Sequence, residues 1–111
     1  MPVESKQLDA SKVVISVTGR LVMGKEVERM ETAVKDLVAG GQTKVYVFDL
    51  SALDYADSSG IGTFVSCLTN IKKAGGEMRL AGANARILRL FQLTGVDHLM
   101  TLFPSVAAAS A

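Results

Sequence analysis

Short apolar runs rich in β-branched residues alternate along this chain with stretches whose apolar residues recur every three or four positions. The clearest run, residues 44–50, is almost continuously apolar, which is typical of a strand covered on both faces in a parallel sheet. Residues 24–39 carry the apolar stripe of an amphipathic helix, and Gly40 and Gly41 then favour a helix C-terminus. Strand–helix–strand repetition with short connections predicts right-handed crossovers and a mainly parallel sheet.

The same patterns place the other elements. Further strands are predicted over residues 12–19, 77–82 and 99–103, with an edge strand within the first eight residues. Further helices are predicted from the Asp57 region to Gly75-Gly76 and from Asn84 to Gly95, and the tail after Pro104 forms one or two helical turns. A chain of 111 residues fits one domain. The expected fold is therefore α/β, a single domain over residues 1–111 with a mainly parallel central sheet of four to five strands and helices packed against it.

Charge and hydropathy exclude several classes of function. The chain has 12 basic and 11 acidic residues and a formal net charge of +1, so it offers no field of one sign to a nucleic acid or an anionic membrane surface. No apolar run approaches the roughly 18 residues that a membrane span needs, and residues 1–6 lack the apolar core of a signal peptide. We expect a cytoplasmic protein that binds no nucleic acid and does not insert into membranes.

The chain has one cysteine, Cys67, and one histidine, His98. A single cysteine excludes an intrachain disulfide, and these two residues cannot supply a site of several cysteines or histidines. Cys67 lies among Phe64, Leu68 and Ile71 in the sequence, where a small buried hydrophobe is the expected role. His98 lies in a short turn and is expected at the surface. We therefore expect no metal and no cofactor.

The connection over residues 50–62 leaves a buried strand and enters a helix. Asp57, Ser58 and Ser59 stand where N-caps belong, because their oxygens can accept the free amide groups of a helix's first turn. Gly60 has no side chain, so the start of the helix can lie close to a neighbouring element or to a partner. On its own, such an Asp-Ser-Ser sequence is typical of ordinary helix capping.

This connection resembles the signature of the bacterial anti-sigma factor antagonists, the STAS domain family. The residues that carry the resemblance are Leu50-Ser51, Leu53, Tyr55 and Asp57-Ser58-Ser59-Gly60-Ile61-Gly62. Two later blocks agree with it: residues 75–80 resemble the family's fourth strand, and residues 89–96 resemble its third helix and exit. The resemblance covers residues 12–103, which is nearly the whole chain.

The resemblance implies a STAS-type fold and a regulatory role. In the family, the serine directly after the aspartate is phosphorylated by a partner serine kinase, the anti-sigma factor, and that position is Ser58 here. The unphosphorylated protein would bind the kinase and release a sigma factor. The phosphorylated protein would not bind until a phosphatase acts on phospho-Ser58. Ser59 would be the capping neighbour, and no enzymatic activity is implied.

The chain departs from the family at Arg20, because many members have an acidic residue after the glycine that ends the second strand. Residues 20–24 and 51–57 are both expected as loops at the carboxyl ends of strands, so Arg20 should lie near Ser58. Arg20 could pair with a phosphate on Ser58 or select an acidic partner, or it could be a surface arginine of no consequence. The residues expected to bind the partner are Asp57, Ser58, Ser59, Gly60, Arg20 and Tyr55.

Other functions stay open beside this one. A serine hydrolase needs a raised serine, usually in Gly-x-Ser-x-Gly, with a histidine and an acid, and only His98 could serve here. The glycine-rich motifs of nucleotide enzymes are absent from the sequence, although weak nucleotide binding is not addressed by that absence. The second alternative is that the chain is a STAS module of another system, such as a stress-signalling complex or a lipid or anion transport complex. Val22 and Met23 either tuck inward or touch a partner.

Overall fold

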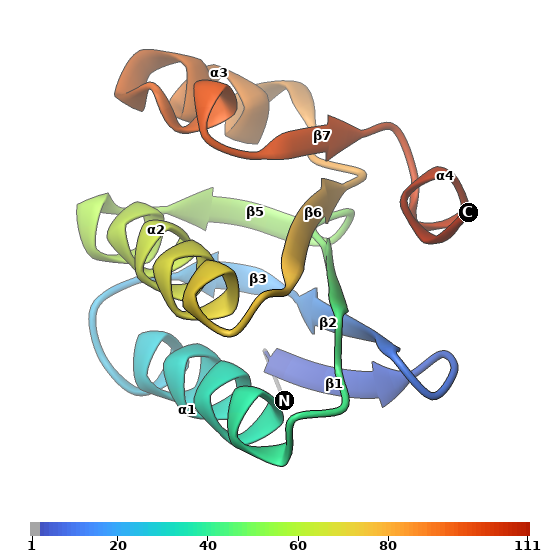
Figure 1. Cartoon of the computed structure of the whole chain (residues 1–111). Helices are drawn as coiled ribbons and strands as arrows, with labels where there is room; N and C mark the ends of the chain where they lie inside the picture. The colour runs from blue at the N-terminus through green and yellow to red at the C-terminus, as the bar shows by residue number, and fades with distance from the viewer. Residues whose placement is uncertain (1–2) are drawn as a thin grey trace.

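The computed structural model describes residues 3–111 (Figure 1). Residues 1 and 2, which belong to the predicted edge-strand region and to the signal-peptide argument, lie outside the described residues. The strands are β1 (Val3–Gln7), β2 (Lys12–Val17), β3 (Gly19–Leu21), β4 (Val45–Asp49), β5 (Leu53–Ala56), β6 (Glu77–Ala81) and β7 (Thr101–Phe103). The helices are α1 (Lys25–Gly40), α2 (Ser58–Lys73), α3 (Ala85–Thr94) and α4 (Val106–Ser110), with a short 3-10 turn, η1 (Val96–His98).

Five strands form the central sheet in the order β1-β2-β4-β6-β7. β1 is antiparallel to β2, and all other neighbours in this sheet are parallel. From β2 onward each strand is added on the same side of the previous one, so right-handed crossovers place the connecting helices on one face. Figure 1 shows α1 and α2 side by side on that face, with α4 on the other side of the strands. The predicted α/β fold with a mainly parallel sheet is confirmed.

The helix-covered face of the sheet holds the larger core. Val13 and Ile15 on β2 point to this face, and so does Phe48 on β4. Phe64 of α2 lies between Phe48 and Phe91, with ring centroids 6.1 and 5.6 Å apart in edge-to-face arrangements. Burying one such side chain contributes about 1.5–3 kcal/mol, and edge-to-face pairs add to that. This aromatic stack fixes α2 against the sheet.

The opposite face of the sheet is covered by α4. Ala109 packs against Val14 and Val47 in a second, smaller core. The Arg79 side chain donates a hydrogen bond to the Ala109 carbonyl at 2.7 Å, and Lys12 donates to the carbonyl of the following residue at 2.6 Å. Cations are favourable at a helix C-terminus, where carbonyl groups lack partners. The helical tail predicted after residue 104 is confirmed, and these two side chains hold it on the sheet.

The helix ends follow the capping signals in the sequence. Gly41 and Gly95 adopt left-handed conformations, with φ of 74° and 79°, at the C-termini of α1 and α3. The Asn84 side chain accepts a hydrogen bond from the Ile87 amide at 2.9 Å and so caps α3. Among the described residues, no helix combines the length and the apolar character needed to cross a bilayer.

Three predictions of secondary structure near the candidate site are wrong. The strand predicted over residues 12–19 ends at Val17, because Gly19 has a left-handed φ of 74° that turns the chain out of the central sheet. β3 then pairs in parallel with β5 as a second, two-stranded sheet. The segments 20–24 and 51–57, which were predicted as loops, therefore contain strands. Their expected proximity is confirmed by this pairing.

Candidate functional site

Ser58 is the first residue of α2 and follows the end of β5. Its side chain is exposed, and within residues 3–111 its hydroxyl has no hydrogen-bond partner. The first turn of α2 brings unpaired amide groups and the positive end of the helix dipole to the same place. A group attached to this hydroxyl would therefore project into solvent at a helix N-terminus.

Asp57 is the N-cap of α2. Its Oδ1 accepts a hydrogen bond from the Gly60 amide at 2.8 Å, and its Oδ2 accepts one from the Met23 amide at 3.0 Å. The Asp57 amide in turn donates to the Leu21 carbonyl at 3.3 Å. One residue therefore connects the start of α2 to the segment between β3 and α1. The capping role that the sequence offered to three neighbouring residues is filled by Asp57.

The hydrogen bonds to Asp57 also stabilise its charge. The Gly60 amide has the largest effect and the Met23 amide the next, and together they hold the pKa of the Asp57 carboxyl below its ordinary value of 3.8. Asp57 is therefore ionised at neutral pH. Any second negative charge at Ser58 would stand directly beside this carboxylate.

Gly60 is buried where α2 crosses the end of β3. A Cβ at this position would lie 2.2 Å from the Leu21 carbonyl oxygen, which is closer than any real contact. By contrast, Gly62 is exposed and a Cβ there would meet nothing within 4 Å. The structure gives Gly60 a packing role, and its burial argues against the direct contact with a partner that the sequence interpretation assigned to it.

Arg20 and Tyr55 face each other across the two-stranded sheet. They are register partners on β3 and β5, and the guanidinium carbon of Arg20 lies 5.0 Å from the centroid of the Tyr55 ring. Both side chains are exposed at the surface. A cation over an aromatic face is an attractive contact that holds both groups in place. The structure thus joins two of the residues predicted to bind a partner.

The sequence left open whether Val22 and Met23 tuck inward or touch a partner. Val22 is half-buried, whereas the Met23 side chain is 76% exposed, the most of any large apolar residue described. The Met23 amide donates a hydrogen bond to Asp57. Ser59 is half-buried, and its carbonyl accepts a hydrogen bond from Thr63 at 2.9 Å. The exposed groups around the helix start are thus Arg20, Met23, Tyr55 and Ser58, which we call the Ser58 surface.

The remaining candidates for chemistry lie elsewhere. Cys67 is buried, and burial, with the negative charge of Glu31, raises the pKa of its thiol to about 12. It is therefore a core residue and not a nucleophile. The exposed His98 has a neighbouring carboxylate, Asp97, at 3.8 Å. No group of three acidic, histidine or cysteine side chains in residues 3–111 is arranged to hold a metal ion.

Comparison with known proteins places this geometry in a family. The model of the STAS domain matches residues 3–109. An anti-sigma-B factor antagonist of Listeria monocytogenes is 29% identical over 104 residues, which cover 90% of this chain and 86% of that protein. The phosphorylated form of SpoIIAA from Bacillus superposes with a TM-score of 0.78 at 19% identity, over 97% of this chain and 96% of that one.

A second similar structure is a sulfate transporter family protein from Wolinella succinogenes, with a TM-score of 0.82 at 16% identity over 94% of this chain and 85% of that one. Both structural likenesses are at low identity and concern the fold. The chain belongs to the STAS domain family, as its sequence motifs indicated. Within that family, its similarity in sequence is to proteins named as anti-sigma-B factor antagonists.

The contact between Gly60 and Leu21 predicts a large difference between two glycine substitutions in the same helix. Gly60→Ala should lower the free energy of unfolding by about 3 kcal/mol, because its Cβ meets a backbone oxygen that cannot move freely. Gly62→Ala should leave it unchanged or raise it by up to about 1 kcal/mol, because alanine favours an exposed helix. Urea unfolding of both variants measures the difference, and equal stabilities would contradict the close approach of β3 and α2.

The lowered pKa of Asp57 predicts a pH-dependent contribution to stability. The carboxylate form is favoured in the folded state, so this contribution is present above the ordinary pKa of 3.8 and is lost as the pH falls through the lower folded value. Asp57→Asn keeps a capping oxygen but has no charge. Its melting temperature should be lower than that of the unmodified protein at pH 7, and the gap should narrow below pH 4. A gap that stays constant down to acid pH would show that the charge of Asp57 does not stabilise the fold.

Proposed function

We propose that this chain is an anti-sigma factor antagonist whose binding is switched by phosphorylation of Ser58. The observation that carries the proposal is the exposed, unbonded Ser58 hydroxyl at the N-terminus of α2. The similarity to the Listeria antagonist supports the general role, and the phosphorylated SpoIIAA structure supports the switch. Unphosphorylated, the chain binds a serine kinase of the anti-sigma type in the cytoplasm and thereby releases a sigma factor.

The fold is suited to carry a phosphate at Ser58 without rearrangement. The contacts that hold the start of α2 run through Asp57, Gly60 and the Leu21 carbonyl, and none of them uses the Ser58 hydroxyl. A helix N-terminus also favours an anion. The modification can therefore leave the core and the aromatic stack beneath α2 unchanged.

The same phosphate would block binding of the partner. It adds a charge of about −1.5 to −2 at neutral pH, beside the ionised carboxylate of Asp57. Two negative groups about 6 Å apart repel by roughly 1 kcal/mol in water and by several-fold more where a partner excludes solvent. An interface formed around an uncharged hydroxyl would lose affinity by about tenfold or more. A phosphatase acting on phospho-Ser58 would restore binding.

The partner contacts extend over the whole Ser58 surface. Arg20 and Tyr55 hold each other in a fixed geometry, and arginine and aromatic residues are over-represented among the residues that dominate binding energies. Met23 adds an exposed apolar side chain whose backbone is held by Asp57. Asp57 and Gly60 contribute indirectly, because their contacts with Met23 and Leu21 position this surface. Ser59 is half-buried beside Ser58.

A second candidate function is a STAS module of a transport complex, in which this chain would be a separate subunit. The observation that favours it is the likeness to the Wolinella sulfate transporter family protein. Affinity capture with the purified chain separates the two roles. Recovery of an ATPase-type serine kinase supports the antagonist, whereas recovery of a membrane permease supports the transport module.

Phosphorylation by a serine kinase of the anti-sigma type, with ATP, tests the leading proposal. The unmodified protein and Ser59→Ala should each accept one phosphate, and Ser58→Ala should accept none, because Ser58 is exposed at the N-terminus of α2 whereas the neighbouring Ser59 is half-buried. Phosphopeptide mapping and titration calorimetry should place the phosphate on Ser58 and show at least tenfold weaker binding to the kinase. A phosphate mapped to any other residue would refute the proposal.

Arg20 gives a separate prediction about the choice of partner. Arg20→Glu should weaken kinase binding by about three- to tenfold, since it removes the cation from the Tyr55 ring and places a negative charge on the surface. Lys44→Glu is the matched control. Lys44 is exposed and directly precedes the N-terminal end of β4, whereas the Ser58 surface lies beyond the C-terminal end of that strand. Equal affinities of the two variants, measured with unphosphorylated and phosphorylated protein, would make Arg20 a surface residue without a role.

A further inference from the structure

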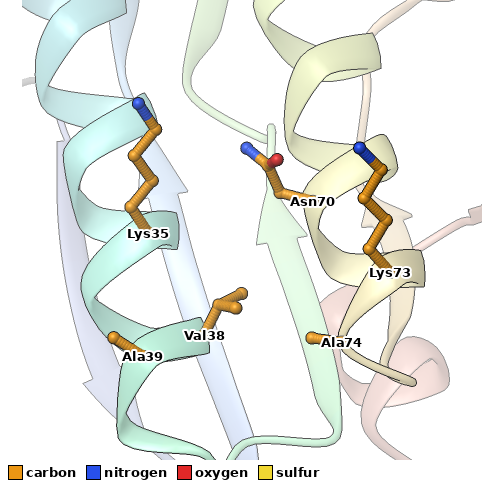
Figure 2. Close-up of a pocket in the computed structure, with 6 residues that line it drawn as sticks. All are labelled: Lys35, Val38, Ala39, Asn70, Lys73 and Ala74. Carbon is orange, nitrogen blue, oxygen red and sulfur yellow. The ribbon is translucent and has the colours of Figure 1, made fainter.

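A groove lies between the C-terminal halves of α1 and α2, at the far end of α2 from Ser58 (Figure 2). Its volume is about 390 Å³. The lining residues are Lys35, Val38 and Ala39 from α1, Asn70 and Lys73 from α2, and Ala74, the C-cap of α2. Figure 2 shows the two lysines on opposite sides of the groove, with Asn70 between them.

The groove exists because the two helices present small side chains to each other at their ends. Deeper in the interface, Met30 and Val34 of α1 and Ile71 of α2 are fully buried and fill the space. At the surface the facing residues include Ala39 and Ala74, whose short side chains leave the space between the helices open. The result is an apolar floor that solvent reaches.

The charges at the groove all have one sign. Lys35 and Lys73 are exposed on its two sides, and neither has an ion pair or a hydrogen bond within residues 3–111. Two amines on either side of an apolar floor complement an occupant that carries carboxylates around an apolar side chain. The charges therefore indicate the chemistry of what binds there.

Two other kinds of occupant fit less well. A second copy of the chain in a two-fold contact would place this groove against itself, so that Lys35 and Lys73 would face lysines. A small molecule is normally enclosed over most of its surface, whereas four of the six lining residues here are exposed. An open groove with positive sides is better suited to a segment of another protein.

We propose that this groove docks an acidic segment of a partner protein, which inserts an apolar side chain between α1 and α2 and places carboxylates next to Lys35 and Lys73. At 1.5 Å per residue, Lys73 lies about 22 Å from Ser58 along the helix axis. That distance exceeds the screening length of roughly 8–10 Å in physiological salt. The groove therefore binds its partner equally well whether or not Ser58 is phosphorylated, and this inference does not depend on the function proposed for Ser58.

A short synthetic helical peptide with leucines flanked by glutamates is the probe. Titrated into isotope-labelled protein, it should shift the backbone amide signals of Val38, Asn70 and Ala74 to saturation. A matched peptide with lysine in place of glutamate should not. Binding should persist in Ser58→Asp within twofold. The proposal is overturned by the absence of saturable shifts at these residues, by equal binding of the lysine peptide, or by loss of binding in Ser58→Asp.

Variants separate the roles of charge and shape. One exposed ion pair changes affinity by about two- to fivefold, so reversal of both charges in Lys35→Glu/Lys73→Glu should weaken peptide binding at least tenfold. Lys72→Glu is the control, because this exposed neighbour does not line the groove. Ala74→Phe should fill the groove and abolish binding with both lysines intact. Unchanged affinity in either groove variant would overturn the proposal.

Two further measurements test the alternative occupants, a small molecule and a second copy of the chain. Decanoate that binds at the same residues as tightly as the peptide would make the groove a site for small amphiphilic anions. Self-association in sedimentation that is lost on reversal of the two lysines would make it a contact between copies of the chain. Either result replaces the proposed partner. A failure to phosphorylate Ser58, by contrast, would change none of these measurements.

Discussion

The carboxylate of Asp57 holds together two segments that α1, β4 and β5 separate along the chain. One oxygen accepts from the Gly60 amide in the first turn of α2, and the other accepts from the Met23 amide after β3. This arrangement requires β3 and α2 to lie very close, and Gly60 makes that possible because it presents no Cβ to the Leu21 carbonyl. This contact fixes Met23 and the start of α2, where Ser58 lies, whereas the pairing of β3 with β5 places Arg20 and Tyr55.

Asp57 caps α2, and the neighbouring Ser58 hydroxyl takes no part in that cap. A charged group could therefore be added to Ser58 without a change in fold. If Ser58 itself capped α2, a phosphate on its oxygen would remove a bond that the helix start needs. Here the preceding aspartate makes that bond, and the Ser58 hydroxyl makes none within residues 3–111. A charge added to Ser58 would therefore change the free energy of binding a partner more than the free energy of unfolding, because a docked partner would exclude water from that charge.

Local signals in the sequence were sufficient for most of the fold and for part of the site. The three long helices, the buried strand β4 and the caps at Asn84 and Gly41 follow from periodicity and backbone preference, which act over a few residues. The pairing of β3 with β5 has no such signal, because these strands have three and four residues and meet only in the folded chain. The sequence allowed Gly60 to lie close either to a neighbouring element or to a partner, and it could not decide between them, because the contact of Gly60 with Leu21 depends on that pairing. The groove between α1 and α2 was not predicted, because it depends on which residues face each other across two helices.

The two surfaces at the ends of α2 are coupled only through what binds them. The Phe48–Phe64–Phe91 stack packs α2 against the sheet, and the distance between the two ends of α2 exceeds the screening length in physiological salt. A partner that occupied both surfaces would lose one contact when Ser58 gained a phosphate and keep the other. It would then remain at a high effective concentration near the Ser58 surface, and binding there would resume without a new diffusional encounter once the phosphate was removed. In that arrangement phosphorylation controls the state of the complex, and the groove controls how long its members stay together.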